Sequence, residues 1–235
     1  MGLAGKKAVI LGGTSGIGLA SAIKLKDLGV SVFAIGRSEG NLKAAAEAGL
    51  QTRQADVLDR AGLASLFESL APFDILICAA TGGPRANGPF LKMDLDAFQA
   101  SFQKLWGYTN AVRLATQHLT ADGAIVLVSG APASKPRLGS IALTSVGGAV
   151  EAFAKGMAVE LAPRRINVVS PGIVDTPMFA VSGEARQQFL TQATNRFLLP
   201  RPGTPEEIAD AVVLAATNPF MTGARIDVDG GWTSP

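Results

Sequence analysis

The stretch Val9-Ile10-Leu11-Gly12-Gly13-Thr14-Ser15-Gly16-Ile17-Gly18-Leu19-Ala20 decides the fold. The apolar run at residues 8–11 is typical of a buried strand, and apolar side chains after Gly18 recur at helical spacing. Between them, glycines allow the backbone to approach a pyrophosphate, and free amides at the helix N-terminus attract its negative charge. A nucleotide-triphosphate loop would need Lys and then Ser or Thr after Gly18, where Leu19 and Ala20 stand. The pattern therefore favours a dinucleotide, although an ordinary tight turn can also carry a glycine cluster.

Length and composition exclude several classes of protein. The 235 residues fit one domain over 1–235, and 48% of them are apolar. The formal net charge is only +2 and the basic residues are scattered, so nucleic-acid binding is not supported. We expect no membrane span and no signal peptide. A single cysteine and a single histidine allow no internal disulfide and disfavour a structural metal site, so we expect a cytoplasmic protein without a metal.

Strand-like and helix-like segments alternate along the chain. Apolar runs predict strands at residues 8–11, 30–35, 52–55, 74–80, 124–128, 166–169 and 226–228. Helical spacing predicts helices after Gly18 and at 41–48, 60–70, 94–118 and 141–161, with a last helix whose N-cap is Thr204. This alternation predicts an α/β fold of the doubly wound type, a seven-stranded parallel sheet with helices on both faces. Its ligand crevice would lie at the carboxyl ends of the strands.

Residues at the ends of the predicted strands indicate which dinucleotide binds. The second strand ends at Gly36-Arg37-Ser38, where an acid would bind a ribose 2′-hydroxyl and an arginine would accommodate a 2′-phosphate. Arg37 therefore favours NADP(H) over NAD(H), the alternative being an exposed arginine at a strand end. Asp56, after the third strand, can accept a hydrogen bond from an adenine amino group.

The fourth strand ends in the small residues Ala79-Ala80, against which a nicotinamide ribose can lie. Cys78 before them has no evident histidine partner, so we interpret it as a buried small side chain rather than a nucleophile. A Gly/Pro-rich loop follows at residues 81–89. Further along, residues 174–203 are predicted to form a lid over the substrate pocket, because loops usually carry substrate choice.

The chain resembles the short-chain dehydrogenase/reductase family over essentially its whole length. Gly12, Gly16 and Gly18 match the family's glycine spacing, and Asp56-Val57 matches its adenine-contacting pair. The segment 170–176, Ser-Pro-Gly-Ile-Val-Asp-Thr, matches the loop that holds the nicotinamide carboxamide, and Val228-Asp229-Gly230-Gly231 matches the C-terminal strand. The resemblance implies a Rossmann-type domain that binds NADP(H), acts on a small carbonyl or alcohol, and assembles as a homodimer or homotetramer through its two long helices.

Together, strand ends and resemblance define one predicted cofactor site. Its members are Gly12, Thr14, Ser15, Gly16, Ile17, Gly18, Arg37, Ser38, Asp56, Val57, Ala79, Ala80, Thr81, Pro171, Gly172, Ile173 and Thr176.

The family's catalytic residues do not carry over. The family reduces carbonyls with a Tyr proton donor, a Lys four positions later, a Ser on the preceding strand and an Asn on the long helix. When the chain is anchored on Phe153-Ala154-Lys155, the Tyr position holds Leu143 and the Lys position holds Gly147. The Ser position holds Gly130, and Lys104 stands at the Asn position. We therefore expect the whole tetrad to be replaced.

Two residues near these positions are candidates for the chemistry. Lys104 would have its pKa lowered in a dry cleft and could then donate a proton to a carbonyl, the alternative being a lysine that reaches out to solvent. Ser129, beside the Ser position, could hydrogen-bond a substrate oxygen, the alternative being a strand-end residue without a catalytic role. The single tyrosine, Tyr108, is interpreted as a helix aromatic packed in the protein.

Three functions remain open from the sequence. The first and favoured one is an NADP(H)-dependent oxidoreductase with a non-standard active site, because the nicotinamide loop at 171–176 is complete. The second is an NADP(H)-binding sensor or partner subunit without turnover. The third is a non-redox enzyme, such as a dehydratase or isomerase, on the same fold.

Overall fold

Seven parallel strands form one sheet in the order β3-β2-β1-β4-β5-β6-β7. The computed structural model describes residues 3–179 and 182–234 of the chain. The strands are β1 Lys7–Leu11, β2 Ser31–Gly36, β3 Gln51–Gln54, β4 Phe73–Cys78, β5 Leu119–Val128, β6 Arg165–Pro171 and β7 Arg225–Val228. The order reverses between β1 and β4, which places a crevice at the carboxyl ends of these two neighbouring strands. The predicted α/β fold, a Rossmann-type domain with a seven-stranded parallel sheet, is confirmed.

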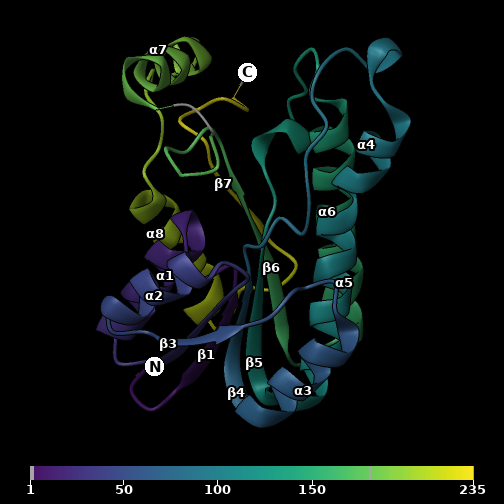
Figure 1. The fold of residues 1–235 in the computed structure, drawn as a ribbon. Helices are drawn as coiled ribbons and strands as arrows, with labels where there is room; N and C mark the ends of the chain where they lie inside the picture. The colour runs from purple at the N-terminus through teal and green to yellow at the C-terminus, as the bar shows by residue number, and fades with distance from the viewer. Residues whose placement is uncertain (1–2, 180–181, 235) are drawn as a thin grey trace.

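Helices cover both faces of the sheet (Figure 1). Helices α1 Gly16–Asp27, α2 Glu39–Glu47 and α8 Pro205–Thr217 lie on one side, and α3 Arg60–Leu70, α5 Gln103–Ala115 and α6 Ile141–Glu160 lie on the other. Two further helices, α4 Leu95–Ser101 and α7 Gly183–Thr194, project beyond the carboxyl ends of the strands. They rise on opposite sides of the crevice.

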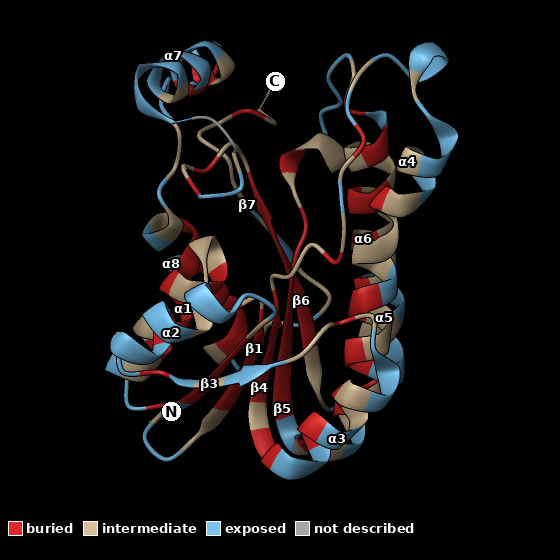
Figure 2. Cartoon of the chain, viewed as in Figure 1, coloured by how far each residue is buried: buried red, intermediate tan, exposed pale blue. Residues whose placement is uncertain are grey.

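The core consists of two apolar layers, one on each face of the sheet (Figure 2). Alternate side chains of β1, such as Val9 and Ile10, belong to different layers, because successive residues of a strand point to opposite faces. The central strands are therefore apolar on both sides, as expected for a parallel sheet between helices. This rigid sheet positions the loops that follow its strands.

The prediction of one continuous helix over 94–118 is wrong. The structure has two helices there, α4 and α5, followed by a 3-10 turn at Thr116–His118. The division falls at Phe102. Just before it, the Ser101 hydroxyl donates to Ala97 O and accepts a hydrogen bond from Ala86 N. The loop after β4 thus packs onto this turn and supplies a contact that periodicity cannot reveal.

The predicted start of the last helix is confirmed in detail. Thr204 Oγ1 accepts a hydrogen bond from Glu207 N, and Glu207 Oε2 accepts one from Thr204 N at 2.8 Å. This reciprocal capping box satisfies two amides that the helix itself leaves without a partner.

The segment 174–203, predicted to be a lid, contains α7, which the sequence pattern did not predict as a helix. Residues 180–181 of that segment lie outside the described residues. Arg186 of α7 forms an ion pair with Asp175 and donates to Thr176 O at 2.8 Å, so the helix is fastened to the chain that leaves β6. None of the described helices combines the length and the apolarity that crossing a bilayer requires.

Candidate active site

The glycine turn after β1 is shaped for close approach of the backbone. Gly12 has a φ of +79°, and a Cβ at this position would lie 2.6 Å from Ala80 N. A Cβ at Gly18 would lie only 2.1 Å from Gly12 O. Side chains at either position would push the turn away from the end of β4 and from the start of α1. The two glycines therefore keep the amides at the N-terminus of α1 open to a ligand.

A cavity of about 360 Å³ adjoins this turn. It is lined by Leu11, Gly12, Thr14, Ser15, Ile35, Gly36, Arg37, Ser38, Asn41, Ala55, Val57, Ala80, Thr81 and Gly82. The structure thus brings together the ends of β1, β2, β3 and β4, which are far apart in the sequence. Eight of the predicted cofactor residues are among these lining residues, and Asn41 is a lining residue that the sequence did not single out.

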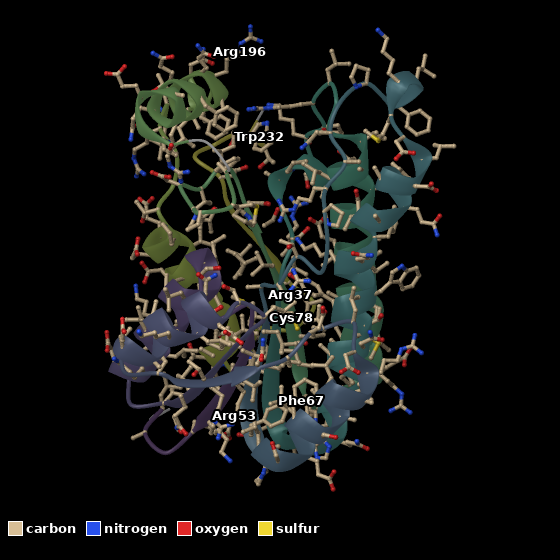
Figure 3. The ribbon with its side chains drawn as sticks, in the orientation of Figure 1. Arg37, Arg53, Phe67, Cys78, Arg196 and Trp232 are labelled. Carbon is tan, nitrogen blue, oxygen red and sulfur yellow. The ribbon has the colours of Figure 1, made fainter. Side chains whose placement is uncertain are left out.

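Arg37 lies at the edge of the cavity, at the carboxyl end of β2 (Figure 3). Its Nη1 lies 3.4 Å from Asp56 Oδ2 and 3.3 Å from Gly82 O. More than half of the Arg37 side chain is exposed, so the guanidinium can reorient toward a ligand. Asp56 itself accepts a hydrogen bond from Leu58 N, which fixes its carboxylate beside the arginine.

The loop after β6 reaches the glycine turn from the other side. A Cβ at Gly16 would lie 3.3 Å from the Thr176 side chain, so the start of α1 touches the predicted nicotinamide loop. Gly172 N donates to Val228 O at 3.0 Å, and a Cβ at Gly172 would lie 2.8 Å from Asp229 Cα. The backbone that follows Pro171 is therefore fixed by its contacts with β7 and with Asp229.

Lys104 points from α5 toward the carboxyl end of β5. Its Nζ donates to Ser129 O at 3.2 Å and lies 5.6 Å from the centre of the Tyr108 ring. Burial, and secondarily the positive charge of Arg85, lowers the pKa of Lys104 to about 7. The side chain is partly buried rather than extended into solvent.

Ser129 contributes its carbonyl oxygen rather than its hydroxyl to Lys104. The hydroxyl lies 3.2 Å from Gly147 O and 3.2 Å from Glu151 Oε1, both acceptors on α6. Glu151 in turn forms an ion pair with Arg225 of β7. The Ser129 hydroxyl is therefore engaged within the protein, and Glu151 and Arg225 are supporting residues that the sequence did not single out.

Tyr108 and Cys78 belong to the core. Tyr108 is 1% exposed and its hydroxyl donates to Val128 O at 3.1 Å, while burial strongly raises its pKa. Cys78 is fully buried, and burial raises the pKa of its thiol well above the ordinary value. A thiol in this state is a poor nucleophile. Both interpretations from the sequence agree with these positions.

Arg85, in the loop after β4, is a charged residue that the sequence reasoning did not select. Its side chain is partly buried, and burial lowers its pKa. A single basic residue inside the Gly/Pro-rich segment 81–89 was the available signal. Only the fold reveals that it lies near Lys104.

Trp232, near the C-terminus, lies below α7 (Figure 3). Phe197 and Trp232 stack with ring centroids 5.4 Å apart. The Arg137 guanidinium lies 3.9 Å from the centre of the Trp232 ring, and its Nη1 donates to Ala193 O at the end of α7. This arginine therefore joins the loop after β5 to α7 and to the C-terminal segment.

Comparison with known proteins identifies the family. Residues 12–233 match the family model described as enoyl-(acyl carrier protein) reductase. The chain is 28% identical to the L-xylulose reductase of Mesocricetus auratus, with 99% of this chain and 98% of that protein covered. The chain therefore belongs to the short-chain dehydrogenase/reductase family, whose members are oxidoreductases that use a nicotinamide cofactor and act on small molecules.

Two solved structures are similar throughout. One is a small-chain dehydrogenase in complex with NADPH, 28% identical with a TM-score of 0.83, covering 96% of this chain and 97% of that one. The other is an apo short-chain oxidoreductase from Pseudomonas aeruginosa PAO1 containing an atypical catalytic center. It is 29% identical, with a TM-score of 0.90 and both chains covered completely.

Proposed function

We propose that this protein is an NADP(H)-dependent oxidoreductase that reduces a small carbonyl compound, with Lys104 as the proton donor in place of the family's usual tetrad. The observation that carries the proposal is the position of the Lys104 ammonium, 3.2 Å from Ser129 O at the carboxyl end of β5. The pKa of about 7 lets this group hold a proton at neutral pH and still release it readily.

The residues around the cavity fit a dinucleotide. The pyrophosphate would lie against the amides that begin α1, where Gly12 and Gly18 leave no side chain in the way. The adenine would lie beside Asp56 and Val57, and the nicotinamide between Ala79 to Thr81 and the loop at 171–176. The small-chain dehydrogenase with bound NADPH, similar over almost the whole chain, supports this placement.

Arg37 supports NADP(H) as the preferred form. It follows the β2 strand directly, where a 2′-phosphate of the adenosine ribose would lie. The segment Gly36-Arg37-Ser38 contains no acid that would repel this phosphate. Asp56, 3.4 Å away, holds the guanidinium near the cavity until a phosphate takes its place.

The surroundings of Gly147 support the replacement of the tetrad. A Cβ at Gly147 would lie 2.9 Å from Ala133 Cβ and 3.3 Å from Ser129 Oγ, so this helix position has no room for a lysine without movement. Lys104 approaches the same Ser129 from α5. In this proposal the lysine that assists the reaction stands on α5 instead of α6, and Leu143 occupies the position of the family's tyrosine.

NADPH, when bound, supplies the hydride that reaches the carbonyl carbon. Lys104 donates its proton to the carbonyl oxygen as the alcohol forms, and the neutral amine then takes a proton from water. Ser129 O orients the ammonium by accepting one of its hydrogen bonds, and the Ser129 hydroxyl fixes that strand end against α6. Tyr108, whose hydroxyl is bonded to Val128 O, takes no part.

Residues 174–203 would close over the substrate. The contact of Arg186 with Asp175 and the contacts of Arg137 with Ala193 O and Trp232 hold α7 beyond the carboxyl ends of the strands, which supports this role. We also propose a homodimer or homotetramer packed through α5 and α6. The exposed apolar side chains of Trp106 and Val159 on these helices support such an interface.

The test combines binding with turnover. Fluorescence titration should show tighter binding of NADPH than of NADH, and a panel of carbonyl compounds should give substrate-dependent NADPH oxidation with a product heavier by two hydrogens. NADPH binding without turnover across carbonyls and alcohols would indicate a sensor or partner subunit. A product of unchanged mass would indicate non-redox chemistry, and no affinity for either coenzyme would refute the whole proposal.

A further inference from the structure

Arg85 is a partly buried cation for which the described residues supply no counterion. Within residues 3–179 and 182–234, its side chain forms no ion pair and no hydrogen bond. Burial of an unpaired charge is costly, and an arginine cannot escape the cost by losing its proton, because the guanidinium stays charged at any physiological pH. Arginines that are largely removed from solvent are therefore normally paired, and Arg85 is not.

The fold holds Arg85 beside the turn that carries Lys104. Ala86 N donates to Ser101 Oγ at 2.9 Å, and a Cβ at Gly82 would lie 2.6 Å from Gln103 O. The contacts of Gly82 and Ala86, on either side of Arg85, therefore pack the loop against the junction of α4 and α5. On its far side, the same loop is held by the hydrogen bond from Gly88 N to Gly139 O.

These contacts bring the loop of Arg85 next to the start of α5, so the two cations Arg85 and Lys104 lie near each other. Lys104 can respond by releasing its proton, and the charge of Arg85 favours that release. The nearby aromatic hydroxyl of Tyr108 is not a counterion, because it is neutral and already donates to Val128 O. A ligand that brings a negative charge near Arg85 would supply the partner that the protein lacks.

We propose that Arg85 binds a carboxylate of the substrate, and that the substrates are small oxo acids whose carboxylate lies a few bonds from the carbonyl that Lys104 protonates. This inference rests on the proposed function for the role of Lys104. The planar guanidinium can bind a carboxylate with two parallel hydrogen bonds, which fixes the orientation of the carbonyl as well as its position. The negative charge of the bound carboxylate also counteracts the effect of the Arg85 charge on Lys104. Lys104 therefore keeps its proton while substrate is present.

The probe is a pair of compounds that differ only in charge, acetoacetate and methyl acetoacetate. Calorimetric titration of the protein saturated with NADP⁺ measures binding without turnover, and titration of the cofactor-free protein repeats the comparison. Acetoacetate should bind about 10- to 100-fold more tightly than its methyl ester in the wild-type protein. Arg85→Gln should abolish that preference and leave NADP⁺ affinity within about twofold, as expected for a lost charge-assisted pair.

Arg53→Gln is the matched control, because Arg53 is exposed on β3 and should leave both affinities unchanged. Circular dichroism confirms that each variant is folded. Equal affinity for the two probes, or failure of both to bind, overturns the inference, as does a preference that survives in Arg85→Gln. A loss of NADP⁺ affinity in Arg85→Gln also overturns it, because the arginine then serves the cofactor phosphates. If the wild-type protein binds no NADP⁺, the proposed function fails, while the titration of the cofactor-free protein still decides the role of Arg85.

Discussion

Replacing Lys104 with methionine should make this protein more stable and less active. Burial lowers the pKa of Lys104 from 10.5 to about 7. A change of one pKa unit corresponds to about 1.4 kcal/mol, so holding this lysine charged costs the folded state up to about 5 kcal/mol. Methionine has a similar length and no charge, so Lys104→Met removes that cost.

The gain in the free energy of unfolding depends on pH, and the lowered pKa of Lys104 determines the direction of this dependence. The unfolded chain keeps the lysine charged up to about pH 10.5, while the folded chain keeps it charged only below about pH 7. The cost is therefore fully present below pH 7, falls as the pH rises and vanishes above about pH 10.5. The lost hydrogen bond to Ser129 O offsets about 1 kcal/mol. Partial exposure of the side chain reduces the gain further, to about 2–4 kcal/mol at pH 6.

Activity should change in the opposite sense. Loss of a general acid typically costs about 10²- to 10⁴-fold in rate, and NADPH affinity should persist, because Lys104 does not line the cavity beside the glycine turn. In the wild-type protein, carbonyl reduction should fall as the pH rises through about 7, since the ammonium is then lost.

Urea denaturation of both proteins at pH 6 and pH 10 measures the gain in the free energy of unfolding, and steady-state kinetics measure the loss in activity. Lys155→Met is the control, because Lys155 is an exposed lysine on α6 and should change neither quantity with pH. Normal turnover of Lys104→Met refutes the catalytic role. A variant destabilised equally at both pH values refutes the idea that the partly buried charge of Lys104 destabilises the folded state.

Three further perturbations test other parts of the structure. Arg37→Ala should weaken NADPH binding about 10- to 100-fold and leave NADH binding unchanged in fluorescence titrations, since only NADPH carries the 2′-phosphate; an equal loss for both coenzymes would contradict this. Tyr108→Phe should keep turnover within a few-fold and cost about 1 kcal/mol in urea denaturation, because its hydroxyl serves Val128 O; a hundredfold loss of turnover would make it the proton donor instead. Thr204→Ala should lower the free energy of unfolding by about 1 kcal/mol through loss of the capping box, whereas Thr204→Ser should restore it.

Much of the candidate cofactor site could be predicted from the sequence, because its parts are local. The turn from Gly12 to Gly18 and the residue after each strand depend on segments a few residues long. The structure brings Gly12 against Ala80 and Gly16 against Thr176, as parallel strands ending at one edge require. Most predicted boundaries lie within two residues of the observed ones, but the start of β5 at Leu119, the division at Phe102 and helix α7 were not predicted.

The candidate catalytic corner was only partly readable. The sequence pointed to Lys104 and Ser129 through their places in the chain and left open whether the Ser129 hydroxyl binds substrate or only caps the strand end. In the structure that hydroxyl donates to Gly147 O and Glu151 Oε1. Arg85 was not identified at all, because a lone arginine in a loop gives no periodic signal. Its position follows from the contacts of Gly82 with Gln103 and of Ala86 with Ser101, which no local pattern in the loop reveals.

The sequence by itself determined the strand-turn-helix start, the parallel α/β architecture and the residues that follow the predicted strands. Backbone conformation and apolar periodicity are short-range properties, so a short stretch of chain is enough to reveal them. Only the tertiary structure decided that Lys104 meets Ser129 O and that Arg85 lies near it without a counterion. A pKa depends on desolvation and on charges brought close by folding, and neither exists until distant segments have packed together.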